Sequence, residues 1–369
     1  MRRRLRRSAL AAALLAAAAL LGGCGSLGYY AQAIGGHLEL MRRSRPVADV
    51  IADPATPPAL RERLRLTQRL RDYAVSELKL PDNDSYRRYA DLGRESAVWN
   101  VVAAPELSLT LKTWCFPIMG CVGYRGYYAR AGAEAEAAAL RAQGWETDVY
   151  GVPAYSTLGW SNWIGGDPLL NTFVDWPEGD LARLIFHELA HQVAYAADDT
   201  TFNESFAVSV ERIGGRRWLA ARADAAAQAA DALARRRRDD FHALTRRTRG
   251  ELEALYASAL PPPAMRERKA AIYAALRADY ATLKRERWDG YAGYDPWFAE
   301  ANNAAFGVLA AYDELVPQFE RLYDREGGDF VRYYAEVRRL AAMPRAERRA
   351  TLATEATRGG PDGRDPHPP

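Results

Sequence analysis

The sequence predicts an α+β fold that is mainly helical, with a small mixed sheet and a long helical hairpin. Apolar residues recur at three-to-four spacing through most of the chain, which is the period of an amphipathic helix. Residues 97–175 differ, because their apolar runs are short, alternate with polar residues and are rich in turn formers. Hydrophobic residues make up 49% of the chain, which is enough for a packed core.

The first residues have the layout of a signal peptide, expected over residues 1–23. Five arginines precede an apolar run from Ala9 to Leu21, which is short for a membrane span. Leu-Gly-Gly before Cys24 matches the bacterial lipobox, in which this cysteine is lipidated after cleavage. The alternatives are an uncleaved membrane anchor and a cysteine without lipid. We expect a lipid anchor at Cys24 in the bacterial cell envelope, facing the periplasm, and Gly25 in place of Asp favours the outer membrane.

The charge of the chain gives no support to a nucleic-acid partner. Removing the five signal-peptide arginines takes the formal net charge from +3 to −2. The basic run at 235–238 is followed directly by Asp239 and Asp240, which indicates a solvated helix face. We therefore expect no nucleic-acid binding.

An N-terminal helical segment is expected over residues 24–96. Helical periodicity covers residues 29–43 and 58–79, with prolines between the two stretches.

A zincin-like catalytic core is expected over residues 97–218, with the small sheet packed against a metal-binding helix. It contains three predicted strands, one predicted helix between them and two predicted helices after them: strands 98–104, 107–111 and 147–152, and helices 131–143, 178–197 and 204–218. Loops and a short strand pair fill the Gly- and Asn-rich part between 155 and 171.

The remaining sequence predicts a C-terminal helical region, 219–355, and a disordered tail, 356–369. Residues 220–288 form the expected hairpin, interrupted only at three prolines, and two or three further helices follow over 297–342. The tail is rich in Gly, Pro, Asp and Arg and cannot build a core.

Two cysteines, Cys115 and Cys121, are predicted to form a disulfide. An oxidising periplasm favours the bond, and the Pro and Gly between them suit a tight loop. Free thiols are the alternative.

The segment His187-Glu188-Leu189-Ala190-His191 predicts a metal site. Residues four apart lie on one face of a helix, so the two imidazoles can bind a single ion. Glu188 can then act as general base on a water bound to zinc, whose pKa the metal lowers to about 7. The alternative is an ordinary amphipathic helix.

A catalytic zinc needs a third protein ligand, and Glu204 is the expected one, with one Zn²⁺ per chain. It lies at the start of the next predicted helix. Thr201 and Glu204 also match a capping box, in which Glu204 would bond only to the backbone. Glu211, two turns further on, is either a second-shell group that orients an imidazole or a surface carboxylate.

A tyrosine, histidine or arginine usually stabilises the oxyanion in such sites. Tyr155, before the metal helix, and Tyr195, one turn after His191, are the candidates.

His187-Glu188-x-x-His191 together with Phe202-Asn203-Glu204-Ser205-Phe206-Ala207 resembles the gluzincin metallopeptidases. More closely, the chain resembles a family of bacterial lipoproteins described as predicted aminopeptidases. The resemblance rests on several further segments: Gly28-Tyr29-Tyr30, Trp114-Cys115-Phe116-Pro117, Tyr124-Arg125-Gly126, Tyr155-Ser156-Thr157-Leu158-Gly159-Trp160 and Asp167-Pro168-Leu169-Leu170-Asn171-Thr172. It implies zinc, a peptide substrate and His187, His191 and Glu204 as ligands.

The chain departs from better-known gluzincin aminopeptidases because it lacks their Gly-x-Met-Glu-Asn segment. The glutamate of that segment holds the free amine of the substrate. A different carboxylate must do so here, and Asp167, Asp175 and Glu178 are the candidates by position. The expected function is a zinc-dependent aminopeptidase. An envelope endopeptidase and a non-catalytic metal-binding scaffold are the alternatives.

Overall fold

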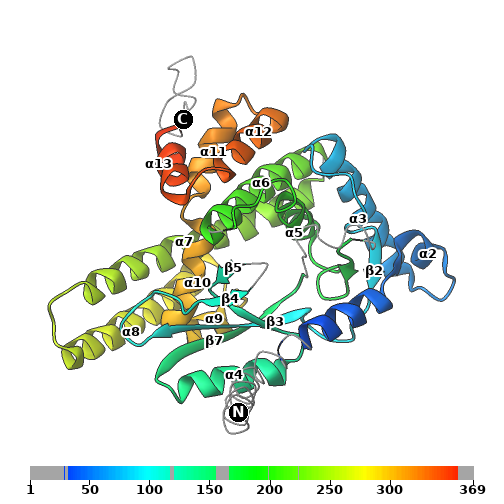
Figure 1. Ribbon diagram of the computed structural model, residues 1–369. Coiled ribbons are helices and arrows are strands. Elements are labelled where there is room, and N and C mark those ends of the chain that lie inside the picture. Colours follow the sequence, from blue (N-terminus) through cyan, green and yellow to red (C-terminus); the bar gives the residue numbers. More distant parts are fainter. Residues whose placement is uncertain are drawn as a thin grey trace, which may run out of the picture.

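The computed structural model describes residue 29 and residues 32–116, 120–154, 166–197, 199–222 and 224–355 (Figure 1). The fold is mainly helical α+β with small sheets, as the sequence predicts. The expected signal peptide, Cys24, Tyr155 and the tail from 356 lie outside the described residues. In the ranges that are described, no helix combines the length and the apolarity needed to cross a membrane.

The N-terminal part consists of helices and one mixed sheet. A helix over residues 32–43 is followed by α2 (Val47–Ala52) and α3 (Pro58–Ser76), which starts with a proline at its first position. The sheet has the order β1 (Arg45–Pro46), β2 (Arg88–Ala90) and β8 (Leu169–Leu170), and β2 runs parallel to β8. This pairing places residues 166–170 beside residues 84–90.

An antiparallel sheet of order β6-β3-β7 forms the second layer. It contains β6 (Arg125–Tyr127), β3 (Val98–Pro105) and β7 (Trp145–Val152). One face packs on α4 (Arg130–Arg141) and the other on α10 (Asn303–Asp313). The sheet therefore packs on α10, which in turn packs on α6, rather than directly on the helix that carries His187 and His191 as expected.

The strand expected at 107–111 is not formed, since residues 106–113 are irregular. Leu109 is buried among the aromatic side chains of the helical hairpin, and Lys112 alone returns to the sheet, where its N–H donates to Ala103. The alternating leucines thus reflect burial without strand pairing. A separate hairpin joins β4 (Trp114–Phe116) to β5 (Gly120–Val122), and a disulfide links Cys115 to Cys121, which lie opposite each other in it.

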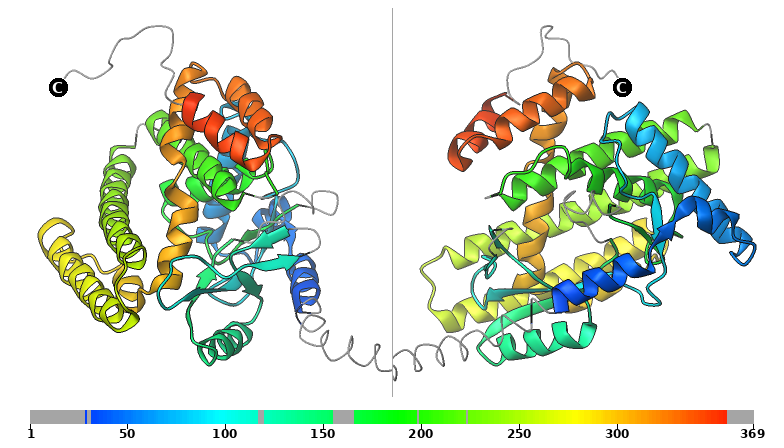
Figure 2. Two further views of the ribbon diagram at one scale, coloured as in Figure 1. Left: turned by 60° about the vertical axis from the view of Figure 1, so that its left-hand side comes forward. Right: turned by 45° about the vertical axis from the view of Figure 1, so that its right-hand side comes forward.

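Helices build the rest of the molecule. α5 (Glu178–Ala190) packs along α6 (Thr200–Ala221), and α7 (Ala225–Tyr256) and α8 (Pro262–Arg287) form the projecting hairpin. The short α9 (Asp295–Glu300) and α10 follow. α11 (Val316–Arg325), α12 (Phe330–Ala341) and α13 (Arg345–Glu355) gather on the side of α6 away from the antiparallel sheet (Figure 2). The sequence predicts two or three helices over 297–342, whereas that range holds most of α9 and all of α10, α11 and α12, and α13 follows it.

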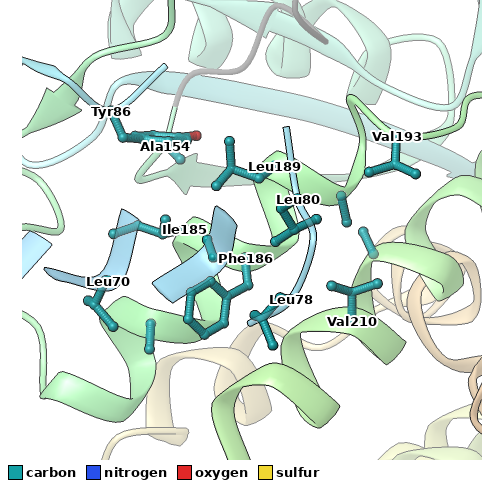
Figure 3. Packing of buried hydrophobic residues seen from close by; sticks show 14 of the residues in the cluster. Leu70, Leu78, Leu80, Tyr86, Ala154, Ile185, Phe186, Leu189, Val193 and Val210 are labelled. Carbon is teal, nitrogen blue, oxygen red and sulfur yellow. The ribbon is translucent and has the colours of Figure 1, made fainter. Parts of the chain in front are cut away.

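The main core lies between α3, α5, α6 and the C-terminal helices. Phe206 of α6 is fully buried and meets the rings of Phe319, Tyr333 and Tyr334. Phe186 of α5 lies with Leu70 and Leu78 in the same core (Figure 3). Truncating one such phenylalanine to alanine costs about 3–5 kcal/mol, so this core holds α5 and α6 firmly against each other.

Candidate metal centre

The first helix of the site, α5, is shorter than the sequence predicts. It begins after Pro177 and ends at Ala190, with His191 as its C-cap, whereas the expected helix runs to 197. The chain turns at this point because the Asn203 carboxamide binds both the N–H and the C=O of Ala196, each at 2.8 Å. His191 keeps helical dihedral angles, φ −57° and ψ −22°. The four-residue spacing from His187 therefore still places both imidazoles on one face.

The second helix, α6, approaches α5 closely because two glycines face it. A Cβ at Gly214 would lie 2.9 Å from the Phe186 ring, and one at Gly215 would lie 3.0 Å from Cγ of Arg183. Larger residues would separate the helices. The close approach brings the first two turns of α6 to the imidazoles.

The N-cap of α6 is Asp199, whose carboxylate accepts a hydrogen bond from the N–H of Phe202 at 3.1 Å. Asp199 is fully buried and paired with Arg348 and Arg349 of α13. The capping box of Thr201 and Glu204 is therefore wrong as an alternative. Glu204 lies too far into the helix for that role, and its carboxylate faces the imidazoles.

Three donor atoms converge between the helices. Nε2 of His187 lies 3.1 Å from Nε2 of His191, and Oε2 of Glu204 lies 3.4 Å and 3.6 Å from these nitrogens. Donors bound tetrahedrally to zinc at about 2.0–2.2 Å are about 3.3–3.6 Å apart. When both nitrogens are unprotonated, as metal binding requires, their lone pairs repel each other at 3.1 Å unless a cation lies between them. The arrangement therefore fits a metal ion, and among the described residues these three side chains form a group that could hold one.

Glu211 lies on the other side of the first imidazole. Its Oε2 is 2.9 Å from Nδ1 of His187. A carboxylate at Nδ1 keeps the proton there, which leaves Nε2 with its lone pair directed at Glu204 and His191. Glu211 is thus placed to orient His187, and the surface alternative is wrong.

The electrostatics of the centre follow from these contacts. Burial by itself would raise the pKa of Glu204, but the nearby His191 and His187 hold that pKa well below its usual range. Burial by itself would lower the pKa of His187, but hydrogen bonds to Glu204 and Glu211 raise that pKa well above its usual value. The group therefore has the charge pattern of a cation site, with one carboxylate on each side of the imidazole.

Glu188 projects from the same helix between the two histidines. It is partly exposed, while His187 and His191 are 9% and 6% exposed. Its charge acts on His187 and also on the phenol of Tyr86. Glu188 thus combines access to solvent with a place next to the donor group and, unlike Glu211, lies between the two histidines in sequence.

Tyrosines also reach the centre. Tyr195, 39% exposed, lies after α5, and both burial and the charge of Glu204 raise its pKa. Sequence reasoning missed Tyr124, just before β6, and Tyr150, on β7. Burial followed by the charge of Glu204 raises the pKa of Tyr124, and burial is also the main cause of the rise at Tyr150, to about 12. Tyr124 stood in a segment that carries the family resemblance and Tyr150 stood in a predicted strand, and neither signal indicates the distance to α6.

A family model described as "Putative aminopeptidase" matches residues 28–352. The chain belongs to this family. The match spans α5 and α6 and reaches Arg348 and Arg349 of α13. No curated protein and no solved structure matches the chain. Peptide-bond hydrolysis at an amino terminus is the activity that the family name implies, and His187, His191 and Glu204 form a group that could hold a metal ion.

Proposed function

We propose that this protein is a zinc-dependent aminopeptidase with a zincin-like centre. The observation that carries the proposal is the convergence of two imidazole nitrogens and a carboxylate oxygen within 3.1–3.6 Å. Zinc suits a set of two nitrogen donors and one oxygen donor, and three protein ligands leave a position open.

Each side chain has one part in the proposed reaction. His187, His191 and Glu204 hold the zinc, and Glu211 fixes the orientation of His187. Bound zinc would supply a Lewis acid that polarises the scissile carbonyl and makes water a nucleophile near neutral pH. Glu188 takes the proton from the attacking water and returns it to the leaving nitrogen. Tyr195 and Tyr124, whose pKa values are raised by burial and then by the charge of Glu204, are the proposed hydroxyl donors for the developing oxyanion.

The proposed location is the periplasmic side of the bacterial outer membrane. The support for it is sequence alone: the basic start, the apolar run and Leu-Gly-Gly before Cys24, which would carry the lipid. Intact-mass measurement of the membrane-extracted protein tests this, since the mature chain would begin at a diacylated Cys24. A chain that still carries residues 1–23 would contradict it.

The activity is tested by pairing metal analysis with Glu188→Gln. We expect about one zinc per chain in both proteins, and a loss of about 10²–10⁴ in kcat on aminoacyl reporter substrates for the variant. Glu134→Gln is the matched control. This glutamate lies on α4, where its side chain is partly exposed and pairs with Arg130. Turnover that survives Glu188→Gln or strong chelators would overturn the enzyme assignment and favour a metal-binding scaffold. Turnover of substrates with acetylated amino ends would favour an endopeptidase.

A further inference from the structure

Tyr86 combines three features that its place in the core does not explain. It is fully buried, its backbone has a positive φ of 64°, and its hydroxyl has no hydrogen-bond partner among the described residues. A non-glycine residue at positive φ costs about 1–3 kcal/mol and is found mainly where function requires it. A buried hydroxyl without a partner is also destabilising. A packing role alone would favour phenylalanine, which fills the same space at lower cost.

The segment that carries Tyr86 is braced to the metal helix. Gln192, directly after His191, donates to Oγ of Ser85 at 3.2 Å and accepts from Asn83 at 2.7 Å. The buried Arg71 donates to the carbonyls of Ser85 at 3.0 Å and of Pro81 at 2.7 Å. These bonds fix the Tyr86 backbone in place relative to the histidines.

Asp167 is held against the same segment. The N–H of Tyr86 donates to the carbonyl of Asp167 at 2.6 Å, and the N–H of Asp167 donates to Oγ of Ser85 at 3.2 Å. Gly166 makes this possible, because a Cβ there would lie 2.3 Å from the backbone nitrogen of Ser85. Asp167 is only 1% exposed. The parallel pairing of β2 with β8 thus places a buried carboxylate next to Tyr86.

The Tyr86 phenol lies close to the catalytic side of α5. It packs in one cluster with Leu189, the residue after Glu188, and with Ala154, and Figure 3 shows the three together. After burial, the charges of Glu188 and Asp167 are the main causes that raise the pKa of this phenol. Tyr86 is therefore within electrostatic reach of the general base and of a second carboxylate.

The other two carboxylates that the sequence offered for amine binding are placed elsewhere. Glu178 accepts from the Trp218 indole at 2.8 Å and pairs with Arg222 at 3.0 Å. It starts α5, about 13 Å along the helix axis from His187. Asp175 is exposed to solvent. Asp167 is thus the one of the three that is both buried and close to the surroundings of Glu188.

We propose that the Asp167 carboxylate and the Tyr86 hydroxyl form the subsite that binds the α-ammonium group of a peptide substrate. This rests on the proposed function and names the group that makes the site specific for free amino termini. An ammonium ion has three N–H donors and needs a paired charge when it leaves water. The carboxylate supplies the charge and one acceptor, and the phenol oxygen, which has an open acceptor position, supplies another.

Ligand binding without turnover tests the subsite. In zinc-loaded Glu188→Gln protein, calorimetry would compare alanine, leucine and lysine amides with the same amides acetylated at nitrogen. We expect the free amides to bind and the acetylated ones not. Adding Asp167→Asn should weaken the free amides by about tenfold to a hundredfold, as expected for a charged hydrogen bond. Unchanged affinity in this variant would overturn the proposal.

Tyr86→Phe keeps the test valid if Asp167→Asn does not fold. Because the hydroxyl has no described partner, its removal should leave the melting temperature unchanged or raised, yet weaken the free amides by about fivefold or more. Tyr333→Phe is the control, since its equally buried hydroxyl lies 2.7 Å from Ser209. That variant should lose stability and keep amide affinity. Equal amide affinity in Tyr86→Phe and the parent would overturn the role of the hydroxyl.

The two proposals fail in different ways. If zinc-loaded wild type shows no turnover but free amides bind in an Asp167-dependent manner, the subsite stands and the aminopeptidase assignment fails. If wild type hydrolyses aminoacyl substrates and Asp167→Asn keeps the preference for a free amine, the assignment stands and the subsite fails.

Discussion

The carboxylate of Glu211 lies 2.9 Å from Nδ1 of His187, on the ring edge opposite the nitrogen that faces Glu204. The two carboxylates lie two turns apart on α6 and hold the imidazole from both sides. One of them is placed to share a metal ion with the ring, and the other to fix the ring in the tautomer that can bind it.

Glu211→Ala should therefore weaken zinc binding without removing a ligand. The expected loss is about 10- to 100-fold in affinity, as is typical when the partner of a metal-bound histidine is removed. Competition with a fluorescent chelator measures it. Glu320→Ala is the control, because that glutamate pairs only with Arg216, at 3.4 Å, on the other side of the core. Equal zinc affinity in wild type and Glu211→Ala would show that the contact does not orient the ring.

Glu204→Ala should abolish tight zinc binding and its effect on stability. A metal that binds only the folded state stabilises it by about 4 kcal/mol at a thousandfold excess over Kd. Chelation should then lower the melting temperature of wild type and of Glu188→Gln, but not of Glu204→Ala. Differential scanning calorimetry with and without chelator measures this. A full chelator response in Glu204→Ala would mean that zinc binds elsewhere.

Much of the site could be predicted from local sequence, because the two histidines and Glu188 lie on one helix, α5, or at its end. The four-residue spacing of His187 and His191 fixes their geometry wherever the helix lies. Glu204 was within reach of the same reasoning, since α6 follows after a short turn. The hairpin α7–α8 could also be predicted from local sequence, because helical periodicity continues through it for over 60 residues.

The parts that could not be predicted depend on contacts between distant segments. Tyr86 reaches the surroundings of Glu188 only through the β2–β8 pairing and the Ser85–Gln192 bond, which joins residues 107 positions apart. The wrongly predicted strand at 107–111 has the same cause, because the hairpin whose cluster contains Leu109 begins at Ala225, 116 residues further along the sequence. Periodicity reports that a side chain is buried, and it does not report which partner buries it.

Asp199→Asn should destabilise the protein and alter its acid sensitivity. Asparagine still caps α6 through its one oxygen, so the change removes the charge that faces Arg348 and Arg349 and one of the two oxygens that accept from them. Breaking such a pair costs about 3–5 kcal/mol. Urea unfolding at neutral pH would measure this loss. A cost below about 1 kcal/mol would show that the pair contributes little.

The pH dependence of the same pair has a definite sign. Burial would raise the pKa of Asp199, but hydrogen bonds and charge from Arg349, with further bonds from Phe202 and Arg348, lower it below the usual value. Its contribution is therefore complete above the unfolded pKa of about 3.9 and is lost as pH falls through the folded pKa. Wild type should lose stability steeply below about pH 4, whereas Asp199→Asn should lose less, so that their unfolding free energies converge. Parallel curves would contradict the lowered pKa.

Gly166→Ala should lower both stability and amide affinity by more than backbone strain alone explains. Gly166 has a φ of +67°, and a Cβ there would lie 2.3 Å from the nitrogen of Ser85. Gly144 has a φ of +87° with nothing within 4 Å of its Cβ, so Gly144→Ala isolates the strain, at about 1–2 kcal/mol. The clash at 166 must also push Asp167 away from Tyr86. Urea unfolding should therefore show a larger loss for Gly166→Ala than for Gly144→Ala, and free aminoacyl amides should bind more weakly only in the former. Equal losses in both variants would mean that the two segments separate at little cost and that Asp167 is not held in place.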